Sequence, residues 1–328
     1  MTQALVVGGT RFVGRHTVTE LRDHGYDVTI FNRGDHENPF ADTDVEHVQG
    51  DRTDDGDLAA AARAVDPDLV IDCVAYHPRE VRTATRIFDD AAAYVYVSSG
   101  AAYGEEAIPK REGETALCEC TDEQATDDST ASYGPRKAEG DRAVFDAAAE
   151  GCNAMSVRPC NIYGPHDYTG RVDYWIERVS EHDRVLVPGD GTNVWHRVYV
   201  EDVARALRIV AEDGEPGEAY NVGDRRATTL DELVEGVATV LGESVEIVHA
   251  GPRELATGEI DPGEFPLYRD YPHLVSTAKL AGLGWDSTPH EAALAATVDQ
   301  YLESDRDGSE YGPARADEER VLGVLDTL

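Results

Sequence analysis

The feature that most constrains the fold is a regular alternation of short apolar runs with longer helical stretches in the first half of the chain. The apolar runs are rich in β-branched residues and lie at 4–7, 27–31, 45–49, 68–73, 94–98 and 154–158. The helical stretches between them lie at 12–24, 54–64, 79–90 and 133–149. Nearly continuous apolar runs are typical of strands buried on both faces of a parallel sheet. The alternation therefore predicts an α/β fold with a doubly wound parallel sheet.

The second half has a different rhythm, in which turns rich in glycine and proline interrupt shorter elements. We expect a helix at 201–212, a strand at 219–222, helices at 229–241 and 289–303, and a charged C-terminal tail. A chain of 328 residues is long enough for two unequal parts. We predict a first domain over 1–165, with segment 197–225 returning to it. A second, smaller α/β lobe is predicted over 166–196 and 226–328.

A glycine-rich turn joins the first strand to the first helix and reads Gly8-Gly9-Thr10-Arg11-Phe12-Val13-Gly14. Glycines allow a tight turn there, and the amino end of the helix offers N–H groups and a positive dipole to a pyrophosphate. A glycine-rich turn of some other α/β protein is the alternative, but the position after the very first strand favours a dinucleotide. We therefore predict that all seven residues contact a dinucleotide and that residues 1–165 form its binding domain.

The end of the second strand bears on the kind of dinucleotide. NAD-preferring sheets usually place an acidic residue there for the ribose hydroxyls. This chain has Asn32 and Arg33 instead, and a guanidinium suits a 2′-phosphate, to which Arg11 could also turn. We therefore favour NADP over NAD, the alternative being that both arginines are solvated surface residues. Asp51, just after the third strand, is placed to accept a hydrogen bond from the adenine amine.

Three residues form a candidate catalytic group. Tyr133 and Lys137 are four residues apart, so they lie on the same face of the predicted helix. An ammonium in that position favours phenolate over phenol, which makes Tyr133 a usable general acid or base. Pro135 is compatible with a helix whose first turn contains it. Ser99 follows the fifth strand, at the edge where α/β sheets bind ligands, and could hold the reacting oxygen. A chance Tyr-Lys spacing is the alternative.

Taken in order, the segments GGTRFVG, QGD, YVSSGAAYG, SYGPRK, VRPCNIYGP, RVYVEDVA and YNVG resemble the extended short-chain dehydrogenase/reductase family. This family of sugar-nucleotide epimerases, dehydratases and reductases has a Rossmann dinucleotide-binding domain, and the resemblance covers roughly the first 225 residues. It implies a hydride transfer, with Ser99, Tyr133 and Lys137 in the catalytic positions and a nucleotide sugar as substrate. Whether the outcome is epimerisation or net reduction or oxidation is left open.

The resemblance also implies binding residues and a possible assembly. It places Gly8, Gly14, Arg33 and Asp51 around the cofactor, and we add Arg52, Ala75 and Pro159 to that set. Asn161 is expected at the mouth of the site and Arg197 near a substrate phosphate, although a structural ion pair is an equal alternative for Arg197. Arg269 is a further candidate for the substrate, on a loop that could form a lid or be plain surface. Relatives commonly form homodimers through two helices, here 79–90 and 133–149.

The sequence departs from the family pattern at several points. Arg11 replaces the middle glycine of the turn, and the segment between Ala75 and Tyr94 is too short to carry the asparagine that epimerases hold on a helix. Gly100 and Ala101 follow Ser99, where sugar 4,6-dehydratases carry an Asp-Glu pair, so dehydration is disfavoured. The turn and the second strand also resemble chloroplast stem-loop RNA-binding proteins. A non-catalytic RNA-binding module on the same fold is therefore the rival hypothesis.

The charge balance bears on partners and on the cellular environment. Sixty-five acidic residues against twenty-nine basic ones give a net charge of −36. This excess argues against nucleic acid as a partner, because phosphate binding needs clustered basic side chains. Molar salt would screen the repulsion, so we expect a halophilic cytoplasm. The sequence predicts no membrane span and no signal peptide. Five cysteines, of which only Cys118 and Cys120 are close in the chain, predict neither a disulfide framework nor a metal site.

Overall fold

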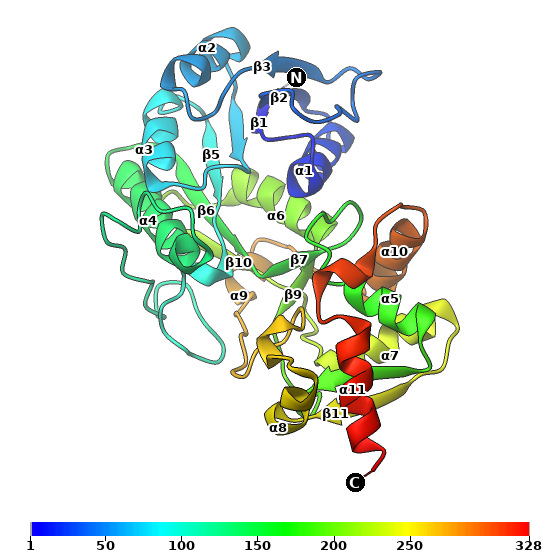
Figure 1. The fold of residues 1–328 in the computed structure, drawn as a ribbon. Coiled ribbons are helices and arrows are strands. Elements are labelled where there is room, and N and C mark those ends of the chain that lie inside the picture. The colour runs from blue at the N-terminus through cyan, green and yellow to red at the C-terminus, as the bar shows by residue number, and fades with distance from the viewer. Residues whose placement is uncertain (1, 328) are drawn as a thin grey trace. The chain divides into compact units, whose positions relative to one another are not determined.

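The computed structural model describes residues 2–327, which divide into two compact units (Figure 1). The first unit comprises Met1–Cys160, Val200–Gly223 and Val275–Ser287, and the second comprises Asn161–Tyr199, Asp224–Leu274 and Thr288–Leu328. Segment Val275–Ser287 had been assigned to the smaller lobe. It lies in the first unit because Lys110 forms a β-bridge with Val275 and the Trp285 indole donates to the Asp202 carbonyl at 2.9 Å.

A seven-stranded parallel sheet forms the centre of the first unit, in the order β10-β6-β5-β4-β1-β2-β3. Its strands are β1 (Gln3–Val7), β2 (Asp27–Asn32), β3 (Glu46–Gln49), β4 (Leu69–Asp72), β5 (Ala93–Val97), β6 (Ala154–Pro159) and β10 (Ala219–Val222). The order reverses between β1 and β4, which is the point where doubly wound sheets open a crevice at their carboxyl edge. The predicted Rossmann-like α/β fold is confirmed.

Helices cover both faces of this sheet (Figure 1). Helices α1 (Phe12–Asp23) and α6 (Val200–Asp213) pack on one face, and α2 (Asp55–Val65), α3 (Pro78–Ile87) and α4 (Thr130–Ala149) lie on the other. The short helices η1 (Gly100–Ala102) and α9 (Ala278–Ala281) complete the unit. The core between the sheet and α2–α4 contains Leu5, Phe31, Tyr94 and Tyr96, each at most 1% exposed. The apolar runs therefore form strands because helices bury both of their faces.

Helix α4 begins earlier than its sequence pattern predicts. It starts at Thr130, so Pro135 lies inside the helix and not in its first turn. A proline there has no N–H for the carbonyl one turn earlier, and helices tolerate this when packing compensates for it. The surrounding residues supply that packing, because Arg136, Lys137 and Ala138 are all buried.

The second unit contains two small parallel sheets and several helices. Strand β7 (Asn161–Tyr163) pairs with β9 (Arg197–Tyr199), and β8 (Arg184–Pro188) pairs with β11 (Glu246–Ala250). The helices are α5 (Asp173–Glu181), α7 (Leu230–Leu241), α8 (Pro252–Leu255), η2 (Ala256–Gly258), η3 (Pro262–Glu264), α10 (His290–Leu302), η4 (Gly308–Tyr311) and α11 (Arg315–Leu325). Thr229 and Glu232 form a capping box at the start of α7.

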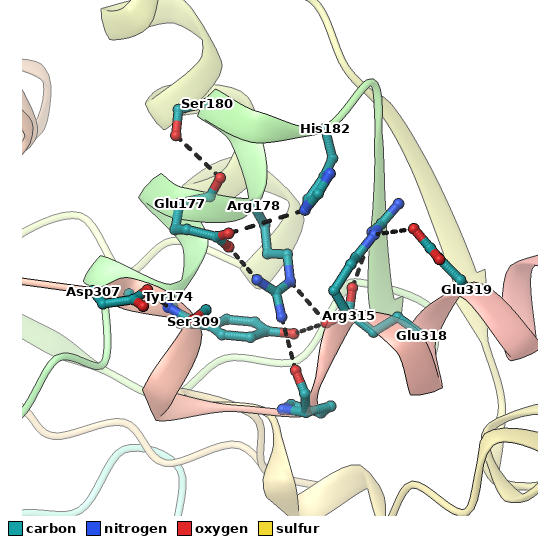
Figure 2. Close-up of polar contacts among 12 residues, drawn as sticks. Tyr174, Glu177, Arg178, Ser180, His182, Asp307, Ser309, Arg315, Glu318 and Glu319 are labelled. Carbon is teal, nitrogen blue, oxygen red and sulfur yellow. Dashed lines mark hydrogen bonds and ion pairs between the residues drawn. The ribbon is translucent and has the colours of Figure 1, made fainter.

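The segment expected to be a charged C-terminal tail contains the helix α11 (Arg315–Leu325). Its inner face buries Val321 and Leu322 together with the carboxylate of Glu318. That carboxylate accepts hydrogen bonds from Arg178 Nε at 2.8 Å, from the Tyr174 hydroxyl at 2.6 Å and from Arg315 at 3.0 Å (Figure 2). A buried ion pair with these extra donors fixes α11 against α5. The many charged residues of this segment kept the sequence pattern from indicating its apolar face.

None of the helices formed by residues 2–327 combines the length and the apolar character needed to cross a membrane.

Candidate active site

The Lys137 side chain lies in the interior of the first unit, behind the carboxyl edge of the sheet. It is 2% exposed, and its Nζ donates to the carbonyl oxygens of Ala75 and Val97, both at 2.9 Å. Those carbonyls belong to the segments that follow β4 and end β5. Nζ also lies 4.8 Å from the ring centre of Tyr96, 5.1 Å from that of Tyr76 and 5.8 Å from that of Tyr133. The ammonium is therefore held by backbone oxygens and surrounded by aromatic rings.

Burial and nearby acids act in opposite directions on this ammonium. Burial lowers the pKa of Lys137 to about 8, and the charges of Asp72, Asp141 and Glu80 oppose that effect. The group is therefore protonated at neutral pH and loses its proton in the mildly alkaline range. An ordinary exposed lysine would lose it near 10.4.

Tyr133 and Ser99 lie on two segments that pack directly against each other. Tyr133 is half-buried near the start of α4, and a Cβ on the adjacent Gly134 would lie 2.5 Å from the carbonyl oxygen of Ala101 in η1. Only glycine allows that approach. Ser99 is the N-cap of η1, and its Oγ accepts from the Ala101 N–H at 3.1 Å. The neighbouring Ser98 is buried, and its hydroxyl has no hydrogen-bond partner among the described residues.

The glycine-rich turn brings the amino end of α1 close to the end of β1. A Cβ on Gly14 would lie 2.1 Å from the Gly8 carbonyl oxygen, so no other residue fits without moving the turn. Phe12 is only 6% exposed and its side chain belongs to the core, so a bound ligand could meet its backbone alone. This close packing brings the first helical N–H groups to the end of β1, a placement that suits a pyrophosphate.

The segment after β2 contains a carboxylate, that of Asp35, close to Arg33. Arg33 is exposed and its Nε lies 3.0 Å from a carboxylate oxygen of Asp35. Arg11 makes a 3.2 Å contact with His36. Asn32 accepts from the Gly34 N–H at 2.8 Å and lies 3.5 Å from the Thr10 hydroxyl. Arg33 is thus at the expected edge, but an incoming 2′-phosphate would compete with Asp35.

Asp51 and Arg52 are neighbours in the chain, but their side chains lie in different surroundings. The Asp51 carboxylate accepts from the N–H and the hydroxyl of Thr53, both at 2.8 Å, and these bonds lower its pKa. The Arg52 side chain instead enters the interior and forms a buried ion pair with Asp72 at 2.6 Å. Arg52 is only 6% exposed, and its expected contact with the cofactor stays a prediction. Pro159, another expected contact, is buried at the end of β6.

The expected substrate residues lie in the second unit. Asn161 Oδ1 accepts from Arg171 at 2.9 Å. Arg197 is 4% exposed and donates to the Thr228 hydroxyl and to the carbonyls of Thr228 at 3.1 Å and Thr229 at 3.3 Å. Its Nη2 thus bonds to neutral oxygens, and a role near a substrate phosphate stays a prediction. The half-buried Arg269 lies with its guanidinium carbon 5.9 Å from the ring centre of Trp195.

Sequence reasoning missed three residues around Lys137. Asp72 and Glu80 are buried acids beside it, and Tyr76 is 44% exposed with its ring against the ammonium. Asp72 ends an apolar strand, and an acid in such a run was the available signal. Glu80 and Tyr76 gave none, because their helix and loop resemble ordinary surface segments.

The model of the NAD dependent epimerase/dehydratase family matches residues 4–223, which include the turn, Ser99, Tyr133 and Lys137. The chain belongs to this family. Its resemblance to extended short-chain dehydrogenases/reductases is thereby confirmed.

Relatives of this family member bear several functions in their names. It is 28% identical over 296 residues to the chloroplast stem-loop binding protein of 41 kDa b from Arabidopsis thaliana, covering 86% of this chain and 74% of that protein. UDP-glucose 4-epimerase of Thermotoga maritima, solved with UDP-glucose, has a TM-score of 0.73 at 22% identity, covering 92% of this chain and 99% of that one. dTDP-glucose 4,6-dehydratase of Bacillus anthracis, solved with NAD, has a TM-score of 0.73 at 20% identity, covering 93% and 98%. These two structures establish likeness of fold.

Proposed function

We propose that the protein is an NAD(P)-dependent epimerase or oxidoreductase that acts on a carbinol or carbonyl carbon of a nucleotide sugar. The observation that carries the proposal is the placement of the Lys137 ammonium, 5.8 Å from the Tyr133 ring and beside the Ser99 segment. Family membership supports the same chemistry. The solved relative with UDP-glucose supports a nucleotide sugar as the substrate class.

A dinucleotide fits the residues present. The tight turn from Gly8 to Gly14 suits its pyrophosphate, the carboxyl edge near Asn32 and Asp51 suits its adenosine, and the loop after β4 suits its nicotinamide end. When bound, the nicotinamide supplies or accepts a hydride. Arg33 supports the preference for NADP, whereas the neighbouring Asp35 and the solved relative with NAD support NAD. We retain NADP as a prediction that rests on Arg33.

The residues of the chain have distinct tasks in this proposal. Tyr133 gives or takes the proton of the substrate hydroxyl, and the Lys137 ammonium stabilises its phenolate form. The Ser99 oxygen already accepts from Ala101, and its hydroxyl hydrogen can still be donated to the substrate oxygen. Lys137 keeps its place because two carbonyls fix it.

The experiment is a turnover assay in molar KCl, with a panel of nucleotide sugars and either NADP or NAD. We expect cofactor-dependent conversion, preceded by dinucleotide that co-elutes with the purified protein and is identified by mass spectrometry. The Arabidopsis relative's name supports RNA binding as the rival function. Retention on immobilised stem-loop RNA that persists in high salt, without turnover of any sugar, would establish the rival.

We also propose a cytoplasmic homodimer that pairs through α3 and α4. A surface groove of about 640 Å³ lies along these helices. Its lining contains a basic row of α3 (Arg79, Arg82 and Arg86), an acidic row at the end of α4 (Asp146 and Glu150), and the further acids Asp55 and Asp89. A two-fold axis would place each basic row against the acidic row of a second copy. Light scattering in molar KCl should give twice the mass of the 35.7 kDa chain. A monomer at all concentrations would contradict this assembly.

A further inference from the structure

The loop from Cys73 to His77 lies between β4 and α3 and contacts Lys137. The Ala75 carbonyl in this loop accepts one of the Lys137 hydrogen bonds at 2.9 Å. The N–H of the same peptide group belongs to Tyr76, and it donates to Glu80 Oε2 at 2.7 Å. One peptide plane therefore joins the carboxylate of Glu80 to the ammonium of Lys137. The direction of that carbonyl depends on how the peptide is held.

Two acids hold the loop on either side of Ala75. Asp72 Oδ1 accepts from the Val74 N–H at 3.3 Å. Glu80 Oε2 accepts from the His77 N–H at 3.0 Å in addition to that of Tyr76. A peptide whose N–H groups are bonded before and after it has little freedom to rotate. The loop thus presents the Ala75 oxygen in one orientation.

Arg52 bonds to the side chain of Asp72 and to the backbone of Glu80. Its Nη2 donates to Asp72 Oδ2 at 2.6 Å and to the Glu80 carbonyl at 2.9 Å. The Tyr94 hydroxyl donates to the same Asp72 oxygen at 3.0 Å. Arg52, Asp72 and Glu80 are 6%, 0% and 6% exposed. Burying a charge costs free energy unless the charge is paired, and the positive charges of Arg52 and Lys137 balance those of the two acids, although Arg52 Nε makes no hydrogen bond within the described part of the chain.

We infer that Arg52, Asp72 and Glu80 are positioning residues for Lys137, and that they act through the Ala75–Tyr76 peptide. This inference rests on the proposed function for the role of Lys137 in turnover. It replaces the assignment of Arg52 to the cofactor. The opposing electrostatic contributions agree with it, because Asp72 and Glu80 both raise the pKa of Lys137 against burial. The charged and titratable groups that face Lys137 are Asp72, Cys73, Glu80 and Asp141, with the phenols of Tyr76, Tyr96 and Tyr133.

The first test is Glu80→Gln, with the exposed Glu46→Gln as its control. The chain has three lysines, so protein labelled with ¹³C at lysine Cε gives three signals, and that of Lys137 is identified by its loss in Lys137→Arg. We expect the titration midpoint of Lys137 to fall by about one unit in Glu80→Gln, because an acid that faces it is neutralised. We expect turnover to fall by roughly tenfold to a hundredfold, with dinucleotide affinity unchanged.

The second test is Arg52→Lys, with the exposed Arg63→Lys as its control. This change keeps a positive charge beside Asp72 but loses the guanidinium that reaches both Asp72 and the Glu80 carbonyl. We expect turnover to fall while the dissociation constant for dinucleotide stays within about twofold of wild type. A weaker dinucleotide affinity with normal turnover at saturation would make Arg52 a cofactor ligand and overturn the inference.

The remaining outcomes separate the inference from the proposed function. A loss of thermal stability in both variants, with turnover and the Lys137 titration unchanged in the folded protein, would make the cluster merely structural and overturn the inference. A wild-type protein without any turnover would remove the proposed function. The Lys137 signal still reports on the cluster in that case, because the nuclear magnetic resonance measurement needs no substrate. If Glu80→Gln does not fold, Arg52→Lys carries the decision.

Discussion

The Lys137 ammonium lies 5.8 Å from the centre of the Tyr133 ring, one helical turn away along α4. Two backbone carbonyls fix the lysine, and the packing of Gly134 against Ala101 fixes the segment that carries the tyrosine. Contacts within the first unit therefore hold both members of the pair. Its chemical roles can be tested separately.

Replacement of Tyr133 by Phe removes the hydroxyl and keeps the ring. Loss of a proton carrier should lower turnover by about two to four orders of magnitude. Dinucleotide affinity should stay near the wild-type value, since the ring still occupies its place. Steady-state kinetics and a binding titration measure the two quantities, and normal turnover would remove Tyr133 from the mechanism.

The pH dependence should report the buried lysine. Because burial lowers the pKa of Lys137 to about 8, the ammonium is present below that value and is lost above it. Turnover should therefore decline above about pH 8, while an exposed lysine would sustain it toward pH 10. The unfolded lysine binds its proton more tightly, so this group adds stability as pH rises from about 8 to its unfolded value. A pH–rate profile with no alkaline decline below pH 10 would contradict the prediction.

The cofactor preference depends on Arg33. If its guanidinium meets a 2′-phosphate, Arg33→Ala should raise the Michaelis constant for NADP by about tenfold and leave that for NAD unchanged. Asp35→Asn should strengthen NADP binding, because it removes the carboxylate 3.0 Å from Arg33. Equal Michaelis constants for NADP and NAD in the wild-type protein would defeat the preference.

The buried carboxylate of Glu318 should matter more than its exposed neighbour. Glu318→Gln removes the buried carboxylate from Arg178, which is 1% exposed and keeps only its ion pair with Glu177, and it should cost about 3 kcal/mol in the free energy of unfolding. Glu319→Gln changes an acid that is 63% exposed and lies 3.4 Å from Arg315, so it should cost no more than about 1 kcal/mol (Figure 2). Denaturant titrations of both variants check the difference, and equal costs would exclude the buried network as the anchor of α11.

Salt should stabilise the folded protein. The net charge is −36, and the acidic side chains repel one another at low ionic strength. The screening length falls to about 3 Å in molar salt. The thermal unfolding midpoint should therefore rise between dilute and molar KCl. A midpoint that stays constant or falls would contradict a halophilic origin of the charge.

Local patterns determined much of this protein. The alternation of apolar runs and helical stretches predicted the parallel sheet, because strands buried on both faces must be apolar throughout. The spacing of Tyr133 and Lys137 predicted one helical face, and the glycine-rich segment predicted a tight turn between the first strand and the first helix. Each of these depends on residues that are near in sequence.

Tertiary structure alone decided the surroundings of those residues. Nothing in the sequence indicated that Arg52 is buried beside Asp51. Its side chain enters the interior because Asp72 and the Glu80 carbonyl, which lie farther along the chain, accept its hydrogen bonds. The sequence around Glu318 is highly charged and did not indicate the apolar face of α11. Arg197 donates hydrogen bonds to Thr228 and Thr229, which are distant in sequence. A charged side chain has no periodic signal that tells burial from exposure. Its position depends on whether the fold brings it a partner that compensates for lost hydration.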